Sequence, residues 1–446
     1  MTIHYLNALA GAGKTYALAR HADRLARQGR KVLFVQPSRR LIDQTIRQEI
    51  EPLSPSYRMT PIHGDVSHNV VQTLVEHFQA PSVGGEIVFA THAALLLLPY
   101  AENAGDWLLI VDEVPTVDVF EELVLPETHS ILTDFLELVP TGAAYGDLVA
   151  RDRGALDRIA RNEHRDQVFG MFAGFAHRVL SEHWTVHALQ SSFASLMRGE
   201  KANGRLTTYS LLQPTIFERF GATIIASACM EDTMLYRLWT AQGVEMVPMT
   251  GRIAKSLRYH RHENGDRIII AYVSDEDWSK TQRDRMVEID GETVCVRDRL
   301  VPLISDVMGG EPFAWMANKD LPDDLFGHFE GAVRLPNSPH GLHDFQGLHQ
   351  VAVLSALNPP PAHFSFMASQ SISPEELRTS HYRTAVYQAV MRISIRDPQS
   401  TEPKLVVVMD RATADWLADL FPGSQVMAMD GLGVALRKGR PGRPRA

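Results

Sequence analysis

Short hydrophobic runs alternate with amphipathic segments along most of this chain of 446 residues. In the first half, the runs have the continuous apolar character of strands that are buried on both faces of a parallel sheet. The segments between them place apolar residues at helical spacing. Strands that alternate with helices in this way predict a right-handed α/β fold. The predicted strands cover residues 3–6, 31–36, 86–91, 107–111 and 222–227.

The second half of the chain repeats this alternation. Residues 294–308 and 381–395 have helical spacing, and several apolar runs lie around them. The number of runs predicts a second α/β sheet of a size similar to the first. The predicted strands of this second sheet cover residues 266–273, 312–316, 331–335, 349–354 and 404–409.

A long segment, residues 129–205, separates two predicted strands of the first sheet. Such a length is too great for one crossover connection and unusual for a loop inside a compact domain. Apolar residues follow helical spacing around Leu156 and around Phe172, so we expect an inserted helical subdomain. Its histidines fit no metal-binding spacing closely, and we expect them to pack.

These patterns predict four parts. The first α/β domain comprises residues 1–128 and 206–250, interrupted by the helical insertion at 129–205, and the second α/β domain comprises residues 251–430. Residues 431–446 form a basic tail with a Gly-Arg-Pro repeat, which we expect to be disordered. Such a tail resembles an AT-hook core, but an electrostatic tether to nucleic acid is the simpler interpretation.

The segment between the first strand and the first helix has the composition of a phosphate-binding loop. Small residues allow backbone N–H groups to surround phosphate oxygens, and the start of the helix adds its positive dipole end. We expect the lysine to reach the β- and γ-phosphates of a nucleotide and the threonine hydroxyl to bind Mg²⁺. The first glycine of the usual pattern is replaced by Ala8. The predicted nucleotide-binding residues are Ala10, Gly11, Ala12, Gly13, Lys14 and Thr15.

Two acidic residues, Asp112 and Glu113, follow the apolar run at 107–111. We expect Asp112 to hold Mg²⁺ together with Thr15, and Glu113 to orient or deprotonate the attacking water. An acidic pair after a strand is common, but its position after a phosphate-binding loop in the same sheet strengthens the assignment.

Composition limits the class of protein. Hydrophobic residues make up 45% of the chain and charged residues 22%, as in ordinary globular proteins. No apolar run approaches the length of a membrane span, and we expect no secretion signal before the first strand. The two cysteines, Cys229 and Cys295, cannot build a zinc cluster, and they fit a reducing cytoplasm, which we expect to be that of a bacterial or phage-infected cell.

The order of these motifs resembles that of the superfamily 1 and 2 helicases, and the DEAD/DEAH type of superfamily 2 in particular. The loop at residues 8–15 is similar to motif I, and Val111-Asp112-Glu113 to motif II, the DExx box. Further similarities are less specific and gain weight from their order. They are Pro37 to Arg40 with motif Ia, Ala90-Thr91-His92 with the motif that follows it, Ser227-Ala228-Cys229 with motif III, Gly341 to Gly347 with motif V, and Gln388 to Arg396 with motif VI.

The resemblance implies two RecA-like domains that hydrolyse ATP between them with Mg²⁺, and a nucleic-acid partner, with DNA preferred to RNA because of the tail. It implies that Gln388 contacts the nucleotide and that an arginine stabilises the γ-phosphate, with Arg392 first and Arg396 second in order of preference. It also implies the coupling residues Ser227, Cys229, Gly341 and Asp344 and the nucleic-acid contacts Pro37, Arg39, Thr91 and His92. For Thr91, a helix cap is a serious alternative.

Two other functions remain open at this point. A packaging ATPase of the phage type with a nuclease half would need carboxylates gathered at strand ends, and the second half offers mainly Asp320, Asp323, Asp324 and Asp344. The other alternative is a nucleic-acid-dependent ATPase switch that does not unwind a duplex.

Overall fold

Two compact units make up the computed structural model, which describes residues 1–66, 69–125, 130–142, 144–200, 204–289, 291–336 and 345–429. The first unit contains Met1–Leu6, Thr15–Ile253 and Pro361–Ile372. The second contains Asn7–Lys14, Ala254–Pro360 and the described part of Ser373–Ala446. Gly341 and Asp344 and the basic tail therefore lie outside the described residues. No helix in the described ranges is long and apolar enough to span a membrane.

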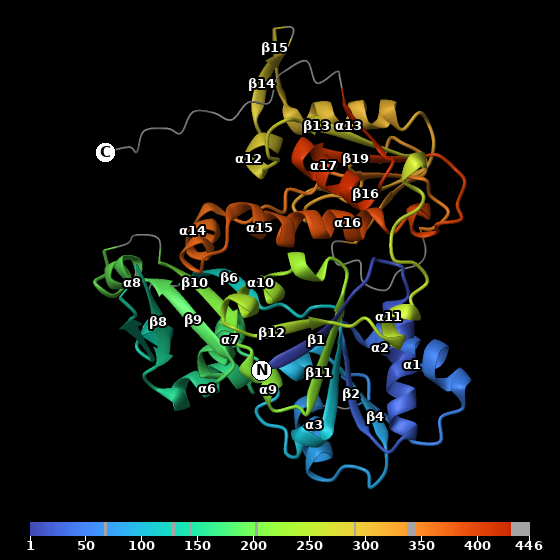
Figure 1. Ribbon diagram of the computed structural model, residues 1–446. Coiled ribbons are helices and arrows are strands. Elements are labelled where there is room, and N and C mark those ends of the chain that lie inside the picture. Colours follow the sequence, from blue (N-terminus) through green and yellow to red (C-terminus); the bar gives the residue numbers. More distant parts are fainter. Residues whose placement is uncertain are drawn as a thin grey trace. The chain divides into compact units, whose positions relative to one another are not determined.

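A seven-stranded sheet forms the centre of the first unit, in the order β12-β1-β11-β5-β2-β4-β3 (Figure 1). The pairs β12–β1, β11–β5, β5–β2, β2–β4 and β4–β3 are all parallel. Strand β5 is buried along its whole length, as its continuous apolar sequence predicts. The strands are β1 (Thr2–Asn7), β2 (Lys31–Gln36), β3 (Arg58–Ile62), β4 (Glu86–Thr91), β5 (Trp107–Asp112), β11 (Ala222–Ser227) and β12 (Glu245–Pro248).

Helices connect these strands, and several begin at a residue that caps them. Ser38 caps α2 by accepting a hydrogen bond from Leu41 N, and Thr91 caps α4 by accepting one from Ala94 N, both at 3.3 Å. The helices are α1 (Lys14–Arg27), α2 (Arg39–Thr45), α3 (Val70–Gln79), α4 (His92–Leu96), α9 (Thr215–Glu218), α10 (Met234–Ala241) and α11 (Arg252–Lys255).

The inserted subdomain is a mixed structure, so the expectation of a purely helical insertion was wrong. Its five strands form an antiparallel sheet in the order β6-β10-β9-β8-β7. They are short and half-buried, and their alternating pattern is weak beside the strong helical spacing of α6 and α7. The elements are β6 (Asp118–Val124), α5 (Ser130–Thr133), β7 (Leu136–Pro140), β8 (Tyr145–Ala150), α6 (Arg153–Arg161), α7 (Gln167–Leu180), β9 (Trp184–Leu189), α8 (Gln190–Met197) and β10 (Arg205–Leu212).

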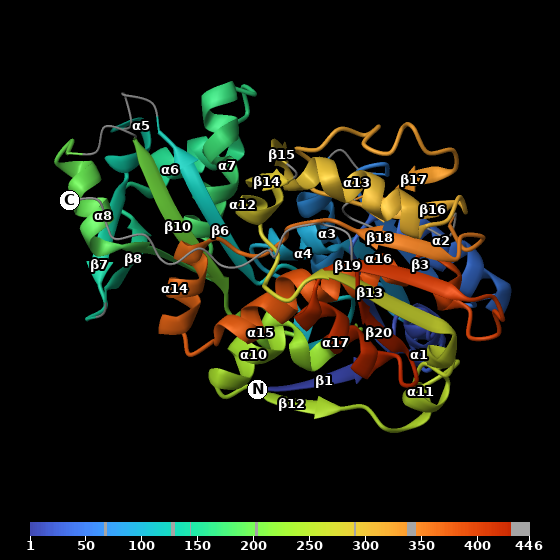
Figure 2. The same cartoon turned by 90° about the horizontal axis from the view of Figure 1, so that it is seen from above.

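A short helix from the second half of the chain, α14 (Pro361–Ser369), belongs to the first unit and packs on this antiparallel sheet. Phe366 stacks on Tyr209 with ring centroids 4.3 Å apart and meets Tyr145 edge-on at 5.1 Å. Because side chains alternate along β10, Tyr209 faces away from Leu206, which packs in the core with α6 and α7. Helix α14 therefore covers the opposite face of the sheet from α7 (Figure 2).

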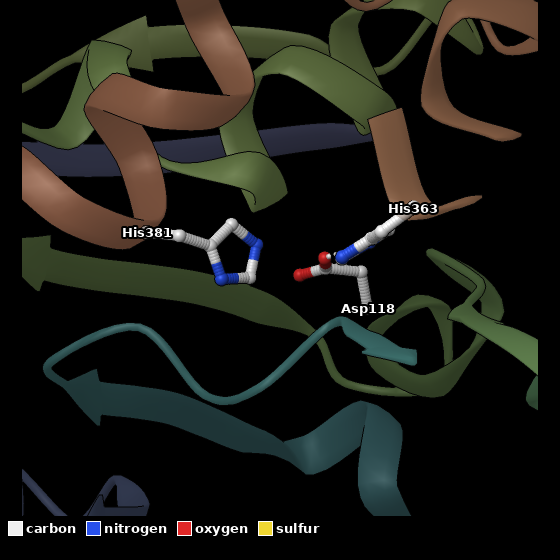
Figure 3. A group of neighbouring side chains, drawn as sticks. All are labelled: Asp118, His363 and His381. Carbon is white, nitrogen blue, oxygen red and sulfur yellow. Dashed lines mark ion pairs between the residues drawn. The ribbon is translucent and has the colours of Figure 1, made fainter. Parts of the chain in front are cut away.

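A buried ion pair also holds α14 in place. His363 Nε2 lies 3.2 Å from Asp118 Oδ2, and both side chains are 6% exposed (Figure 3). The His363 ring also stacks on Phe120, at a centroid distance of 5.4 Å. The sequence pattern does not predict this attachment, because it joins residues separated by more than half of the chain.

A six-stranded sheet in the order β17-β16-β18-β19-β13-β20 forms the second unit, and all its neighbouring strands are parallel. Together with the first sheet it confirms the predicted fold class, α/β with two parallel sheets. The strands are β13 (Ile268–Ser274), β16 (Phe313–Met316), β17 (Ala332–Arg334), β18 (Gln350–Val353), β19 (Lys404–Asp410) and β20 (Gln425–Ala428), with a separate hairpin of β14 (Met286–Ile289) and β15 (Glu292–Cys295).

The predicted helix at 381–395 ends earlier than expected. The helices of this unit are α12 (Lys280–Arg283), α13 (Val296–Val307), α15 (Pro374–Arg378), α16 (Thr384–Val390) and α17 (Arg411–Leu420). After α16 the backbone of Ile393 is extended, and a single 3₁₀ turn follows at Ser394–Arg396. Arg392 and Arg396 therefore do not share one face of a helix, contrary to what their four-residue spacing predicts.

We expect Phe366→Ala to loosen the antiparallel sheet. Removal of a fully buried aromatic ring that contacts two tyrosines should lower the free energy of local unfolding by about 3 kcal/mol. Hydrogen exchange measured by mass spectrometry should then show faster exchange in α14 and β10. Ser365→Ala, at an exposed position of the same helix, is the matched control and should exchange as the wild type does. Equal exchange in both variants would contradict the packing role of Phe366.

Candidate nucleotide-binding site

The phosphate-binding loop has the backbone that its glycines predict. Gly11 and Gly13 have φ values of +82° and +87°, in the left-handed region that favours glycine. Between them, the N–H of Ala12 donates to the carbonyl oxygen of Leu9 at 3.1 Å, which closes a turn. Lys14 is the first residue of α1, so the loop ends where the helix dipole begins.

Two tyrosine hydroxyls of the second unit hold the peptide groups of Ala10 in this loop. The Tyr259 hydroxyl donates to the carbonyl oxygen of Ala10 at 2.6 Å. The N–H of Ala10 donates to the Tyr387 hydroxyl at 3.0 Å. The Tyr387 hydroxyl also lies 2.8 Å from Nε2 of His262, whose ring stacks on Phe421.

Two arginines lie against the same loop. A Cβ added to Gly11 would meet Cγ of Arg396 at 2.8 Å, and one added to Gly13 would meet Cγ of Arg258 at 3.5 Å. The N–H of Arg258 also donates to the carbonyl oxygen of Ala12 at 2.9 Å. The close approach at Gly11 gives a second reason, besides φ, why glycine occupies that position, whereas a Cβ at Gly13 would make only an ordinary van der Waals contact.

These two arginines repel each other. Burial lowers the pKa of Arg396, and the charge of Arg258 lowers this pKa further, while Tyr259 opposes the change. Within the described ranges no carboxylate forms an ion pair with either guanidinium. An anionic ligand at the loop would neutralise both charges and relieve their repulsion.

Asp112, at the end of β5, is the centre of a buried hydrogen-bond group in the first unit. Thr15 Oγ1 donates to Asp112 Oδ2 at 2.7 Å, and Nε2 of Gln36 donates to the same oxygen at 3.0 Å. Nε2 of His92 lies 3.1 Å from the carbonyl oxygen of Asp112, to which it donates. A threonine hydroxyl beside a carboxylate is a set of hard oxygen donors that fits Mg²⁺. Thr15 and Asp112 are therefore suited to hold this ion, as the sequence predicts.

Glu113 is held in a conformation that is rare for a residue with a side chain. Its φ is +65°, and its N–H donates to the carbonyl oxygen of Ala226 on β11 at 2.8 Å. Oγ of Ser227 lies 3.1 Å from Oε2 of Glu113, so the serine predicted to couple sites contacts the residue predicted to act on water. Cys229 follows in a left-handed turn with φ of +50°.

The predicted nucleic-acid contacts lie at the carboxyl edge of the first sheet, where β2 and β4 end side by side. Pro37 follows β2, and Thr91 ends β4 and caps α4, which is the alternative that the sequence left open for it. Arg39 forms an exposed ion pair with Asp65, and His92 contacts the backbone of Asp112. Nothing in the structure tests contact with nucleic acid, so these four residues stay a prediction.

The residues of the predicted motif VI differ in burial and in which of them lies at the phosphate-binding loop. Gln388 lies half-buried on α16, and Arg392 follows this helix with only 5% of its surface exposed. Arg396, the second choice from the sequence, is the arginine that lies at the phosphate-binding loop.

Several residues of the site were not predicted, namely Gln36, Arg258, Tyr259, His262 and Tyr387. Gln36 carries a detectable signal, because a glutamine at the end of an otherwise apolar buried strand needs a polar partner. Tyr387 carries none, since a Tyr at helical spacing is usually a core residue.

Comparison with known proteins supports the assignment of the first unit. Residues 2–114 match the family described as the res subunit of type III restriction enzymes. No curated protein matches the chain. The family match agrees with the resemblance to superfamily 1 and 2 helicases that the motifs predict. Taken with the two parallel sheets and the phosphate-binding loop, it supports an ATP-hydrolysing enzyme of the helicase type.

Solved helicase structures are distantly similar. Xpd4 of S. tokodaii is 12% identical with a TM-score of 0.46, and the alignment covers 96% of each chain. Dbp5 of S. cerevisiae bound to RNA and ADP BeF3 is 10% identical with a TM-score of 0.42, and covers 96% of this chain and 86% of Dbp5. The helicase MrfA bound to DNA and AMPPNP is 13% identical with a TM-score of 0.32, and covers 96% of this chain and 50% of MrfA. These likenesses are too distant to assign a ligand.

We expect His262 to make the free energy of unfolding depend on pH. Burial lowers its pKa to about 4, so between pH 6.5 and 4 the unfolded chain binds a proton that the folded chain does not. Stability should therefore fall as the pH is lowered, by about 2 kcal/mol between pH 7 and 5 from this group. Thermal unfolding of wild type and His262→Gln at both pH values measures the difference. An equal loss in both proteins would show that His262 is not buried in this way.

Proposed function

We propose that this chain is an ATP-driven translocase or helicase that moves along nucleic acid, with DNA as the preferred partner. The observation that carries the proposal is a hydrogen-bonded group in which Asp112 accepts from Thr15 and Gln36. Thr15 directly follows a loop that contains two glycines in the left-handed region. This arrangement fits a nucleoside triphosphate and its metal ion. The DNA preference is supported by the basic sequence of residues 431–446 alone.

The roles of the residues follow from their chemistry. Backbone N–H groups of the loop and the ammonium group of Lys14 would bind the β- and γ-phosphates. Mg²⁺, held by Thr15 and Asp112, would supply charge that stabilises the phosphate oxygens. Glu113 would orient the attacking water and accept its proton, and the Ser227 hydroxyl would fix the position of that carboxylate.

An arginine at the loop would stabilise the charge that develops on the γ-phosphate. The structure favours Arg396 for this role over Arg392, because its side chain lies against Gly11. Arg258, which contacts the loop at Gly13, would add a second positive charge close to the phosphates. Cys229 and Cys295 are both free thiols, which fits action in a reducing cytoplasm.

The alternative of a nuclease half has less support. Asp320 pairs with Arg283 and Lys280, and Asp323 pairs with Arg334, so these carboxylates are neutralised by cations. A cluster that binds catalytic metal ions would leave carboxylate oxygens directed toward the ions. Absence of metal-dependent cleavage of DNA, together with strand-stimulated ATP hydrolysis, would exclude the nuclease.

We expect Glu113→Gln to retain ATP binding and to lose hydrolysis. The amide keeps the size of the side chain but cannot accept a proton, so kcat should fall by at least about 10²-fold. Phosphate release and binding of a fluorescent ATP analogue measure the two properties, and Lys14→Ala should lose both. Hydrolysis at the wild-type rate in Glu113→Gln would show that another residue orients the water.

We expect Arg396→Ala to reduce kcat more than nucleotide affinity. A guanidinium that acts on the transition state contributes about 10³-fold or more in related phosphoryl transfers, so a fall of at least about 10²-fold is expected. Arg392→Ala tests the other candidate, and Arg411→Ala, on the exposed surface of α17, is the control. If Arg392→Ala shows the larger loss, the assignment from the loop contact is wrong.

Movement on nucleic acid needs a separate test. Labelled duplexes with either a 3′ or a 5′ overhang should be unwound in the presence of ATP, and the overhang that is required gives the direction of movement. ATP hydrolysis that is stimulated by single strands without any duplex opening would favour the switch over the helicase. Comparison of DNA with RNA strands tests the preferred partner.

A further inference from the structure

Ala10 lies in a loop that has few means of its own to keep its shape. From Ala8 to Gly13 the loop contains only alanine, leucine and glycine, so no polar side chain can anchor it. Two of its residues are glycines in the left-handed region, which gives the free loop many alternative conformations. A loop that becomes ordered only when a ligand arrives weakens the binding of that ligand.

Hydrogen bonds to both polar groups of Ala10 supply the missing anchor. A backbone N–H can only donate and a carbonyl oxygen can only accept, so each contact has one direction. Tyr387 therefore accepts from the N–H of Ala10, and Tyr259 donates to its carbonyl oxygen. Tyr387 has no exposed surface, so loss of its hydroxyl would leave the Ala10 N–H without this partner.

His262 sets the direction of the remaining Tyr387 proton. This histidine is 4% exposed, and burial keeps its pKa low, so the ring is neutral at ordinary pH. Nε2 of the neutral ring can accept a hydrogen bond when the proton is on Nδ1. The hydroxyl of Tyr387 then donates to His262, and its lone pairs stay available to Ala10.

We propose that Tyr387, oriented by His262, and Tyr259 are positioning residues that hold the phosphate-binding loop in its nucleotide-binding shape. This inference rests on the proposed function, because it assumes that the loop binds a nucleoside triphosphate. The two hydroxyls fix the peptide of Ala10 before the ligand arrives, so that the following amides need little rearrangement. None of the three side chains needs to touch the nucleotide.

The test is a comparison of nucleotide affinity among variants of the full-length chain. Tyr387→Phe and Tyr259→Phe each remove one hydroxyl and keep the ring. Each should raise the Kd for a fluorescent ADP analogue, and the KM for ATP, by about tenfold, while kcat changes less than about twofold. Tyr272→Phe is the matched control, since Tyr272 lies on β13 beside Asp275 and away from the loop, and it should bind as the wild type does.

Variants of His262 separate an orienting role from a packing role. His262→Gln keeps a side-chain acceptor and should retain most of the affinity. His262→Phe keeps an aromatic ring beside Phe421 but removes the hydrogen bond from the Tyr387 hydroxyl to residue 262, and it should raise the Kd as Tyr387→Phe does. Equal affinity of these two variants would overturn the orienting role.

The outcomes also distinguish this inference from the proposed function. If the wild type binds the nucleotide and Lys14→Ala does not, the loop is the site. Unchanged or tighter binding by both Tyr→Phe variants would then overturn the positioning role alone. A wild type that binds no nucleotide, or Lys14→Ala that binds it normally, would reject the proposed function and the inference with it. If Tyr387→Phe fails to fold, the affinity of Tyr259→Phe alone tests the positioning role, because the Tyr259 side chain is partly exposed and its change should not prevent folding.

Discussion

The hydrogen bond between Thr15 and Asp112 is the interaction on which the candidate site depends. It joins the residue that follows the phosphate-binding loop to the end of β5, so that two segments almost a hundred residues apart present their oxygens together. Parallel pairing of β5 with β2 and β11 brings the other participants to the same edge, because the carboxyl ends of parallel strands coincide. Gln36 and Ser227 are thus placed by strand register and need no special loop.

Much of the fold could be predicted because parallel strands are apolar throughout. The strands β2, β4, β5 and β19 stand out as continuous hydrophobic runs, and their predicted positions agree with the structure within one or two residues. The insertion was predicted wrongly for the opposite reason. Its strands are solvent-exposed on part of one face, and their period of two is interrupted by residues such as Gly146, whereas α6 and α7 have an unmistakable helical period.

The residues of the candidate site also divide into those that the sequence predicts and those that it does not. Lys14, Thr15, Asp112 and Glu113 could be identified because their chemistry is local, a residue type at the end of a strand or the start of a helix. Tyr259 and Tyr387 contact Ala10, and His262 contacts Tyr387, across long separations in the sequence, and their residue types are those of an ordinary core. The resemblance to motif VI puts Arg392 before Arg396, and helical spacing predicts both on one face. The extended backbone at Ile393 breaks that helix, and Arg396 is the arginine that lies against the loop.

Helix α14 has a consequence for how the polypeptide can be divided. The chain crosses from the second unit into the first at Pro361 and returns after Ile372, so neither unit is a continuous stretch of sequence. A truncated protein that stops near residue 253 would lack Phe366 and His363, and Tyr209, Tyr145 and Asp118 would face water in their place. Production of the amino-terminal half by itself would therefore give a fragment with an exposed apolar surface that is prone to aggregate. A soluble fragment would need residues 361–372, either as a covalent fusion or as an added peptide.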